Sequence, residues 1–309
     1  MALPMLRSLC VSDDGAALCC APMDERPTGS PSSGYPLIVI GMHRSGTSLL
    51  TTLLHRAGVP MGNDRNVHDE SAFFLELNKF LFRAAHAEWD YPQAVLLLLE
   101  VPELRQALVE HLRSQCASRG TRSYLGWRRC MRSSRMDAQP GPWGWKDPRN
   151  TFTLPLWLEV FPNARVLNVY RNGVDVAESL VVRERRRSAR IHNAVRSCRC
   201  LSHQRAFELW TEYVTTSLRF TAALAPDRVH QVRYESFLEA PESGLREVAA
   251  FLGLDLSDAE LRALVTDVEP ERALAFRRDP QLVRLYRETA HHPLMQRLEY
   301  GDLSCLPAS

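Results

Sequence analysis

Lysine is nearly absent from this 309-residue sequence. Only Lys79 and Lys146 occur, so 36 of the 38 basic residues are arginines. A GC-rich coding sequence explains that bias most simply, and it makes a lysine beside a motif more informative. The formal net charge of +2 is too small to indicate binding of nucleic acid or of a membrane by itself.

Two further absences concern cysteine spacing and long apolar runs. The eight cysteines include no Cys-x-x-Cys pair, so they predict free thiols in a reducing compartment, with no zinc site and no disulfide scaffold. No run approaches the roughly eighteen apolar residues of a membrane span. Asp13 and Asp14 interrupt the apolar amino-terminal patch, which argues against a secretory signal. The sequence thus predicts a soluble, cytoplasmic protein without a membrane span.

The pattern of turn-forming and apolar residues predicts where the folded domain begins. Residues 1–33 mix Cys, Asp, Pro, Gly and Ser without periodicity, which is typical of a flexible leader. "PLIVIG" (36–41) is a short apolar run rich in branched residues, as expected of a strand buried on both faces of a parallel sheet. "GTSLLTTLLHRAG" (46–58) repeats leucines at helical spacing and ends at a glycine suited to a helix carboxyl terminus.

Strands and helices then alternate along the rest of the chain. Further strands are expected at 164–171 and 228–235, and helices at 71–86, 102–120, 151–162, 172–185 and 243–254. This alternation favours one α/β domain over 34–304, in three layers, with helices on both faces of a mostly parallel sheet. Ligand sites are then expected at the carboxyl ends of the strands. Helical insertions are expected at about 87–142 and 184–205, with 113–135 as an exposed, arginine-rich segment.

The stretch "GMHRSGTS" (41–48) has the G-x-x-x-x-G spacing of a phosphate-binding loop between the predicted strand and helix. Such a loop offers backbone N–H groups and a helix dipole to an anion. A nucleoside triphosphatase would have a lysine where Thr47 stands and an aspartate at a strand end for magnesium. Here the strands end in Arg171 and in Tyr234, so the sequence predicts a phosphate site without the magnesium machinery.

These motifs resemble those of the sulfotransferases that use 3′-phosphoadenosine 5′-phosphosulfate (PAPS). Their first signature, Lys/Arg-Ser-Gly-Thr-Thr/Ser after a strand, is matched by "RSGTS", and their second by Arg171 followed eight residues later by Ser179. "WKDPRNTFTLPLWLEVFP" resembles the Lys-Asp-Pro segment of protein-tyrosine and many bacterial sulfotransferases. The resemblance runs from about Pro36 to the "RLEYGD" near the end, and it is strongest at 36–58, 143–183 and 228–254.

The resemblance implies how the donor is bound. Lys146 would stabilise the sulfuryl group in the transition state together with Arg44, because charge develops there as the group moves. Arg171 and Ser179 would bind the 3′-phosphate that distinguishes this donor from ATP. Arg277 and Arg278 are weaker candidates for a late basic contact to the same phosphate. The remaining donor-binding candidates are Arg44, Ser45, Gly46, Thr47 and Ser48 for the phosphosulfate and Tyr234 for the adenine. A buried tyrosine at a strand end is an equally good interpretation of Tyr234.

The acceptor hydroxyl needs a base, and the resemblance implies a glutamate. Members with Lys-Asp-Pro use a glutamate after the first loop helix, and Glu70, eight residues before Asn78, matches that position. His68 is the rival base. As an alternative without function, Asp69 and Glu70 could simply begin a helix, and Lys146 could be an exposed charge at a strand end.

The expected activity is therefore transfer of a sulfuryl group from PAPS to a hydroxyl or amine of an unidentified acceptor, by in-line displacement without a metal. Two alternatives stay open, a P-loop kinase or nucleotide hydrolase and a donor-binding module without turnover. Eight arginines and one acid from 183 to 205 could flank an anionic donor or acceptor, although a solvated helical face is favoured. Nucleic-acid binding is not expected, because few aromatics interleave with the arginines.

Overall fold

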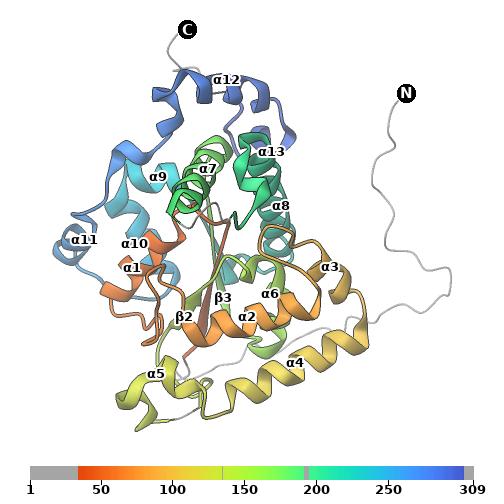
Figure 1. Cartoon of the computed structure of the whole chain (residues 1–309). Coiled ribbons are helices and arrows are strands. Elements are labelled where there is room, and N and C mark those ends of the chain that lie inside the picture. The colour runs from red at the N-terminus through yellow and green to blue at the C-terminus, as the bar shows by residue number, and fades with distance from the viewer. Residues whose placement is uncertain (1–33, 134, 191–194, 303–309) are drawn as a thin grey trace, which may run out of the picture. The chain divides into compact units, whose positions relative to one another are not determined.

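Four parallel strands form the sheet of the computed structural model, which describes residues 34–133, 135–190 and 195–302 (Figure 1). Their order is β2-β1-β3-β4, and the registers of all three pairs are parallel. The predicted leader, 1–33, lies outside the described residues. The strands are β1 (Pro36–Ile40), β2 (Trp143–Lys146), β3 (Arg165–Tyr170) and β4 (Val229–Arg233).

Alternate side chains of β1 point into two different cores, which makes the fold three-layered. Leu37 and Val39 pack on one face with α1 (Thr47–Arg56), α10 (Pro241–Phe251) and α11 (Asp258–Val265). Ile38 and Ile40 pack on the other face. Since strand side chains alternate between faces, one apolar run supplies both cores. The predicted α/β class with helices on both faces of a parallel sheet is confirmed.

The second face of the sheet is covered by helices from the middle of the chain. They are α2 (Ala72–Ala84), α4 (Pro102–Cys116), α5 (Thr121–Cys130) and α6 (Asn150–Val160). A third apolar cluster joins α7 (Gly173–Arg190), α8 (His203–Thr221), α12 (Pro280–Thr289) and α13 (Pro293–Arg297). Shorter elements are α3 (Ala94–Leu99), α9 (Tyr234–Glu239), η1 (Cys198–Leu201), η2 (Pro226–Arg228), η3 (Pro270–Arg272) and η4 (Ala275–Arg278). None of the helices in the described ranges is long and apolar enough to cross a bilayer.

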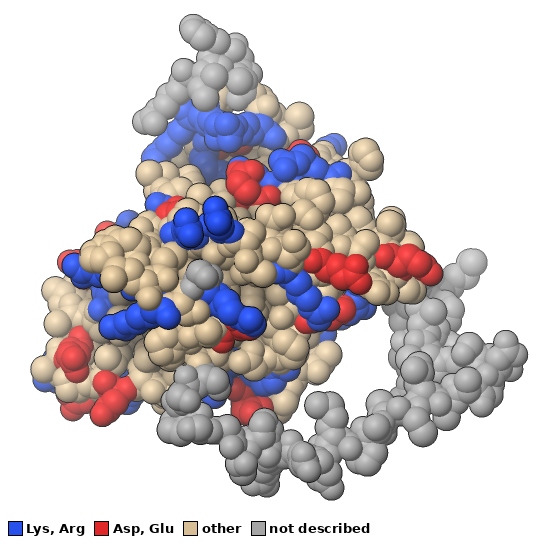
Figure 2. Space-filling view, turned by 90° about the horizontal axis from the view of Figure 1, so that it is seen from below, with Lys and Arg blue, Asp and Glu red and all other residues tan. Residues whose placement is uncertain are grey.

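The arginine-rich segment 113–135 is not a wholly exposed insertion, and that prediction is wrong at its centre. Tyr124 and Leu125 of α5 are buried, and the Tyr124 hydroxyl donates a hydrogen bond to the Gly144 carbonyl of β2 (2.7 Å). Basic side chains on the face seen from below are scattered among acidic and uncharged ones (Figure 2). Such mixing is typical of a solvated surface rather than of a single-sign binding patch.

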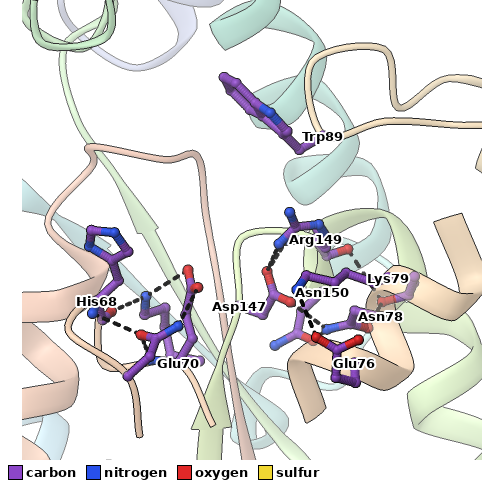
Figure 3. A network of polar contacts seen from close by, with 12 residues as sticks. His68, Glu70, Glu76, Asn78, Lys79, Trp89, Asp147, Arg149 and Asn150 are labelled. Atoms are coloured by element: carbon purple, nitrogen blue, oxygen red, sulfur yellow. Dashed lines mark hydrogen bonds and ion pairs between the residues drawn. The ribbon is translucent and has the colours of Figure 1, made fainter. Parts of the chain in front are cut away.

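A buried polar network fixes the segment that follows β2 against α2 and α6 (Figure 3). The Asn78 amide donates to Asp147 (3.0 Å) and Asn150 (2.8 Å). The Asn78 carbonyl oxygen accepts from Thr153 and Trp157, both at 2.9 Å. Every hydrogen-bonding atom of this buried amide is thus engaged, which makes the network rigid and costly to break.

The carboxyl ends of the four strands bring the sequence motifs to one edge of the sheet. The loop Gly41–Gly46 follows β1, Asp147 follows β2, and Arg171 follows β3. The predicted third strand ends earlier than expected, because Tyr234 begins α9 instead of closing β4. As parallel strands all end at the same edge, distant motifs meet there.

Two separate reasons require that residue 46 be a glycine. Its φ of 94° lies in the left-handed region, and a Cβ atom there would lie 2.2 Å from Cδ2 of Tyr234. Gly58 at the end of α1 has a similar φ of 90° but no atom within 4 Å of such a Cβ. Comparison of the two positions therefore separates backbone strain from the clash with Tyr234.

We predict that Gly46→Ala destabilises the protein more than Gly58→Ala does. In both variants the free energy of unfolding should fall by about 1–2 kcal/mol, because alanine is strained in left-handed backbone. Gly46→Ala should lose roughly another 1–3 kcal/mol, since Tyr234 must move out of a packed position. Denaturant unfolding measures the two free energies, and equal losses would show that Tyr234 does not constrain the loop.

Candidate functional site

The loop between β1 and α1 presents free donors at a helix amino terminus. Arg44 and Gly46 have φ values of 71° and 94°, and no side chain caps α1. The Ser45 hydroxyl is buried and has no hydrogen-bond partner within the described chain. Uncapped N–H groups, a helix dipole and an unpaired hydroxyl together form a cradle suited to a phosphate-like anion.

Arg44, Arg171 and Ser179 lie together beside this loop. The Arg44 Nε atom donates to the Ser179 hydroxyl (2.8 Å), and Arg171 donates to the Arg44 carbonyl (3.4 Å). The Arg171 guanidinium lies 4.9 Å from the centre of the Tyr234 ring and 3.2 Å from Asp175. Its Nε atom is buried without a partner in the described chain. The structure therefore brings together the residues that the sequence assigned to the 3′-phosphate and the adenine.

Positive charge is concentrated around that group. Although Arg44 as a whole is exposed, desolvation and neighbouring guanidinium groups, Arg183 first among them, lower the pKa of Arg44 from its usual value. Arg171 also donates to the carbonyl of Arg272 (3.0 Å). The backbone of Arg272 thus lies beside Arg171, while its guanidinium pairs with Glu269 (2.6 Å), and no sequence motif pointed to this residue.

Lys146 and Glu70 form a buried ion pair at the other end of the loop. The Lys146 ammonium lies 3.2 Å from Glu70 Oε1, and the two side chains are 2% and 10% exposed. The His68 carbonyl accepts hydrogen bonds from both Lys146 (2.5 Å) and Ser48 (2.9 Å), which ties this pair to α1. His68 and Glu70 lie next to each other in Figure 3. The alternative of an exposed strand-end lysine is wrong.

Glu70 does not simply begin a helix either. Ser71 caps α2, and no acidic residue lies in the first turn of that helix. The Glu70 carboxylate instead faces Lys146 and accepts from the Asn66 amide (3.3 Å). His68 is exposed, and only its backbone touches Lys146. Glu70 is therefore the acidic group placed against the predicted sulfuryl-stabilising lysine.

Lys146 and Glu70 line a cavity of about 290 Å³, called the transfer cavity from here on. A second cavity of about 310 Å³ follows β4 and α9 but includes none of the predicted site residues. Among the described residues no three His, Cys, Asp or Glu side chains are grouped to hold a metal ion. The lining of the transfer cavity is His43, Arg44, Thr47, Ser48, His68, Glu70, Leu75, Lys79, Trp89, Lys146, Pro148, Arg149, Arg183, Glu184, Arg187 and Arg196.

His43 belongs to this lining, although it lies inside the loop motif and was not predicted as a site residue. It is only partly buried as a residue, but its Nε2 atom is shielded from solvent and unpaired within the described chain. Its ring meets Trp89 edge-on at 4.9 Å. Desolvation, reinforced by nearby cations such as Arg183, lowers the pKa of His43 well below 6.5. His43 is therefore a neutral imidazole at pH 7.

Comparison with known proteins gives a family match. A family model described as "Sulfotransferase family" matches residues 36–258. Among solved structures, sulfotransferase STF9 from Mycobacterium avium is 16% identical, with 83% of this chain and 76% of that chain covered and a TM-score of 0.44. A sulfotransferase from Alicyclobacillus acidocaldarius is also 16% identical, with 89% of this chain and 99% of that chain covered and a TM-score of 0.43. No match was found among curated proteins.

We predict that His43 makes the protein less stable as the pH falls from 7 to 5. Its ordinary pKa near 6.5 holds in the unfolded chain, which then binds more protons than the folded state, so acid favours unfolding. In His43→Gln the loss of unfolding free energy between pH 7 and pH 5 should be smaller by about 1 kcal/mol. Urea unfolding at both pH values tests this, and parallel pH dependences in the two proteins would contradict it.

Proposed function

This chain belongs to the sulfotransferase family, and on that premise we propose that its sulfuryl donor is PAPS. The acceptor group is a hydroxyl or an amine, and transfer occurs by in-line displacement without a metal. The metal-free reaction and a cytoplasmic location are parts of the proposal that rest on the sequence. The geometry around the loop supports the roles of the residues that bind the donor and transfer the sulfuryl group.

The observation that carries the proposal is the convergence of Arg44, Arg171 and Ser179. Two guanidinium groups and a hydroxyl meet beside a phosphate loop that has no lysine. Arginine is suited to bidentate binding of phosphate, and the unpaired Nε atom of Arg171 is a donor available to it. A donor with a second phosphate on its ribose uses this cradle, whereas ATP has no group to fill it. Tyr234 is 4% exposed and lies under the Arg171 guanidinium, so its assignment to the adenine rests on the resemblance alone.

The loop and Lys146 would then act on the phosphosulfate. The N–H groups at the start of α1, with Thr47 and Ser48, hold the 5′-phosphate as it becomes the leaving group. Lys146 stabilises the charge on the sulfuryl oxygens in the transition state. Because Lys146 and Glu70 are adjacent, the group that stabilises the sulfuryl and the group that takes the acceptor proton lie at the same point of the cavity.

Adenosine 3′,5′-bisphosphate (PAP) should stabilise the protein without magnesium. A free concentration a hundredfold above its Kd adds about 2.7 kcal/mol to the free energy of unfolding, which appears as a higher Tm. Arg171→Gln should weaken PAP binding at least tenfold, because one charge-assisted contact to the 3′-phosphate is lost. Arg278→Gln is the matched control, since Arg278 is an exposed arginine outside the cluster, and its PAP affinity should match the wild type.

Thermal shift and calorimetric titration measure both quantities. Stabilisation by magnesium-ATP alone would support a P-loop kinase or hydrolase and would refute the proposed donor. Equal PAP affinities in wild type and Arg171→Gln would refute the assignment of the 3′-phosphate cradle.

A further inference from the structure

One face of α7 carries polar side chains from the donor loop into the transfer cavity. Ser179, Arg183 and Arg187 follow one another at intervals of four residues, which places them on the same face of a helix. Ser179 accepts the hydrogen bond from Arg44, while Arg183 and Arg187 line the cavity. Arg185 and Arg186, between them, are exposed. The solvated face expected from the sequence is therefore correct for Arg185 and Arg186 but wrong for Arg183 and Arg187.

Three of the cavity arginines have no carboxylate partner among the described residues. None of the ion pairs among the described residues includes Arg183, Arg187 or Arg196. The Nε atom of Arg187 is buried and unpaired within the described chain. Both acids of the lining are engaged elsewhere, Glu70 with Lys146 and Glu184 with the backbone N–H groups of 196 and 197. Backbone N–H groups do not neutralise Glu184, so this part of the lining has three arginines against one carboxylate and keeps a net positive charge.

Trp89 holds one of these arginines in place. The Arg183 guanidinium lies 4.8 Å from the centre of the Trp89 ring, a distance at which the ring face attracts the cation. A stacked guanidinium keeps its N–H edge free for a planar anion, so the stack orients Arg183 without neutralising it. Trp89 stands apart from the Asp147 and Glu70 clusters in Figure 3, on another part of the lining.

The charge also exceeds what the proposed donor needs. The loop, Arg44 and Lys146 are sufficient for the phosphosulfate, and Arg171 for the 3′-phosphate. Clustered cations raise the local concentration of an anionic ligand and repel one another until such a ligand binds. At about 290 Å³ the cavity is of the size that holds a small molecule.

We propose that the acceptor is a small hydroxyl compound with an anionic group of its own, a carboxylate, phosphate or sulfate, that Arg183 and Arg187 bind. This inference rests on the proposed function, because it places the acceptor hydroxyl against Glu70. In the step itself the hydroxyl oxygen bonds to sulfur as the bond from sulfur to the 5′-phosphate oxygen breaks. The hydroxyl proton goes to Glu70, and PAP leaves with the electron pair.

Two pairs of probes test the inference by calorimetric titration at low salt, each with and without saturating PAP. One pair is 4-hydroxybenzoate and 4-hydroxybenzamide, and the other is glucose 6-phosphate and glucose, so the arms separate a carboxylate from a phosphate. In at least one pair the Kd of the anionic member should be at least tenfold lower than the Kd of its neutral match. Arg187→Gln should abolish that preference and leave PAP affinity unchanged. Arg186→Gln, an exposed neighbour on the same helix, should retain it.

The outcomes separate this inference from the proposed donor. If PAP binds but neither anionic probe is preferred, the acceptor inference is wrong and the donor assignment stands. An anion preference that Arg187→Gln and Arg186→Gln lose equally would also overturn it. If PAP fails to bind while the anion preference still depends on Arg187, the donor assignment fails and the anionic subsite is retained.

Discussion

The site depends on the buried ion pair between Lys146 and Glu70, which joins two parts of the chain 76 residues apart. Lys146 ends β2, whereas Glu70 precedes α2, so the pair fixes the strand relative to the helix. A buried charge that loses its partner costs about 3–5 kcal/mol, so neither side chain can turn away. The Asn78 network holds the next residues of the same segment, and Asp147 in it is buried, which raises the pKa of that carboxyl.

The parallel sheet brings the other residues of the candidate site close to this ion pair. Four strands that end at one edge of the sheet place the loop, Lys146, Arg171 and the start of α9 at that edge. Helix α7 then extends from Arg171 with Ser179, Arg183 and Arg187 on one face. Residues that recognise the donor and residues that recognise the acceptor would thus lie along a single helix.

What the sequence could predict followed from spacing within short segments. The loop between a buried strand and a helix, and the eight residues from Arg171 to Ser179, are local patterns, and the structure places Arg44, Arg171 and Ser179 together. Their role in binding a phosphate stays a prediction. Arg272 and His43 escaped prediction, since their importance comes from contacts across the fold: Arg272 reaches Arg171 through its backbone, and Trp89 meets His43 from a distant loop. The arginines of α7 could be divided into cavity and solvent faces only once the orientation of the helix was known.

The central claim is that Lys146 and Glu70 carry out sulfuryl transfer from PAPS, and turnover of sulfur-labelled PAPS with an acceptor selected from a hydroxyl library tests it most directly. Lys146→Met and Glu70→Gln should each lower kcat by about a hundredfold or more, the usual effect of removing an electrostatic stabiliser or a general base, with PAP affinity changed little. Label that reaches no acceptor, or a Glu70→Gln enzyme with the kcat of the wild type, would contradict the account.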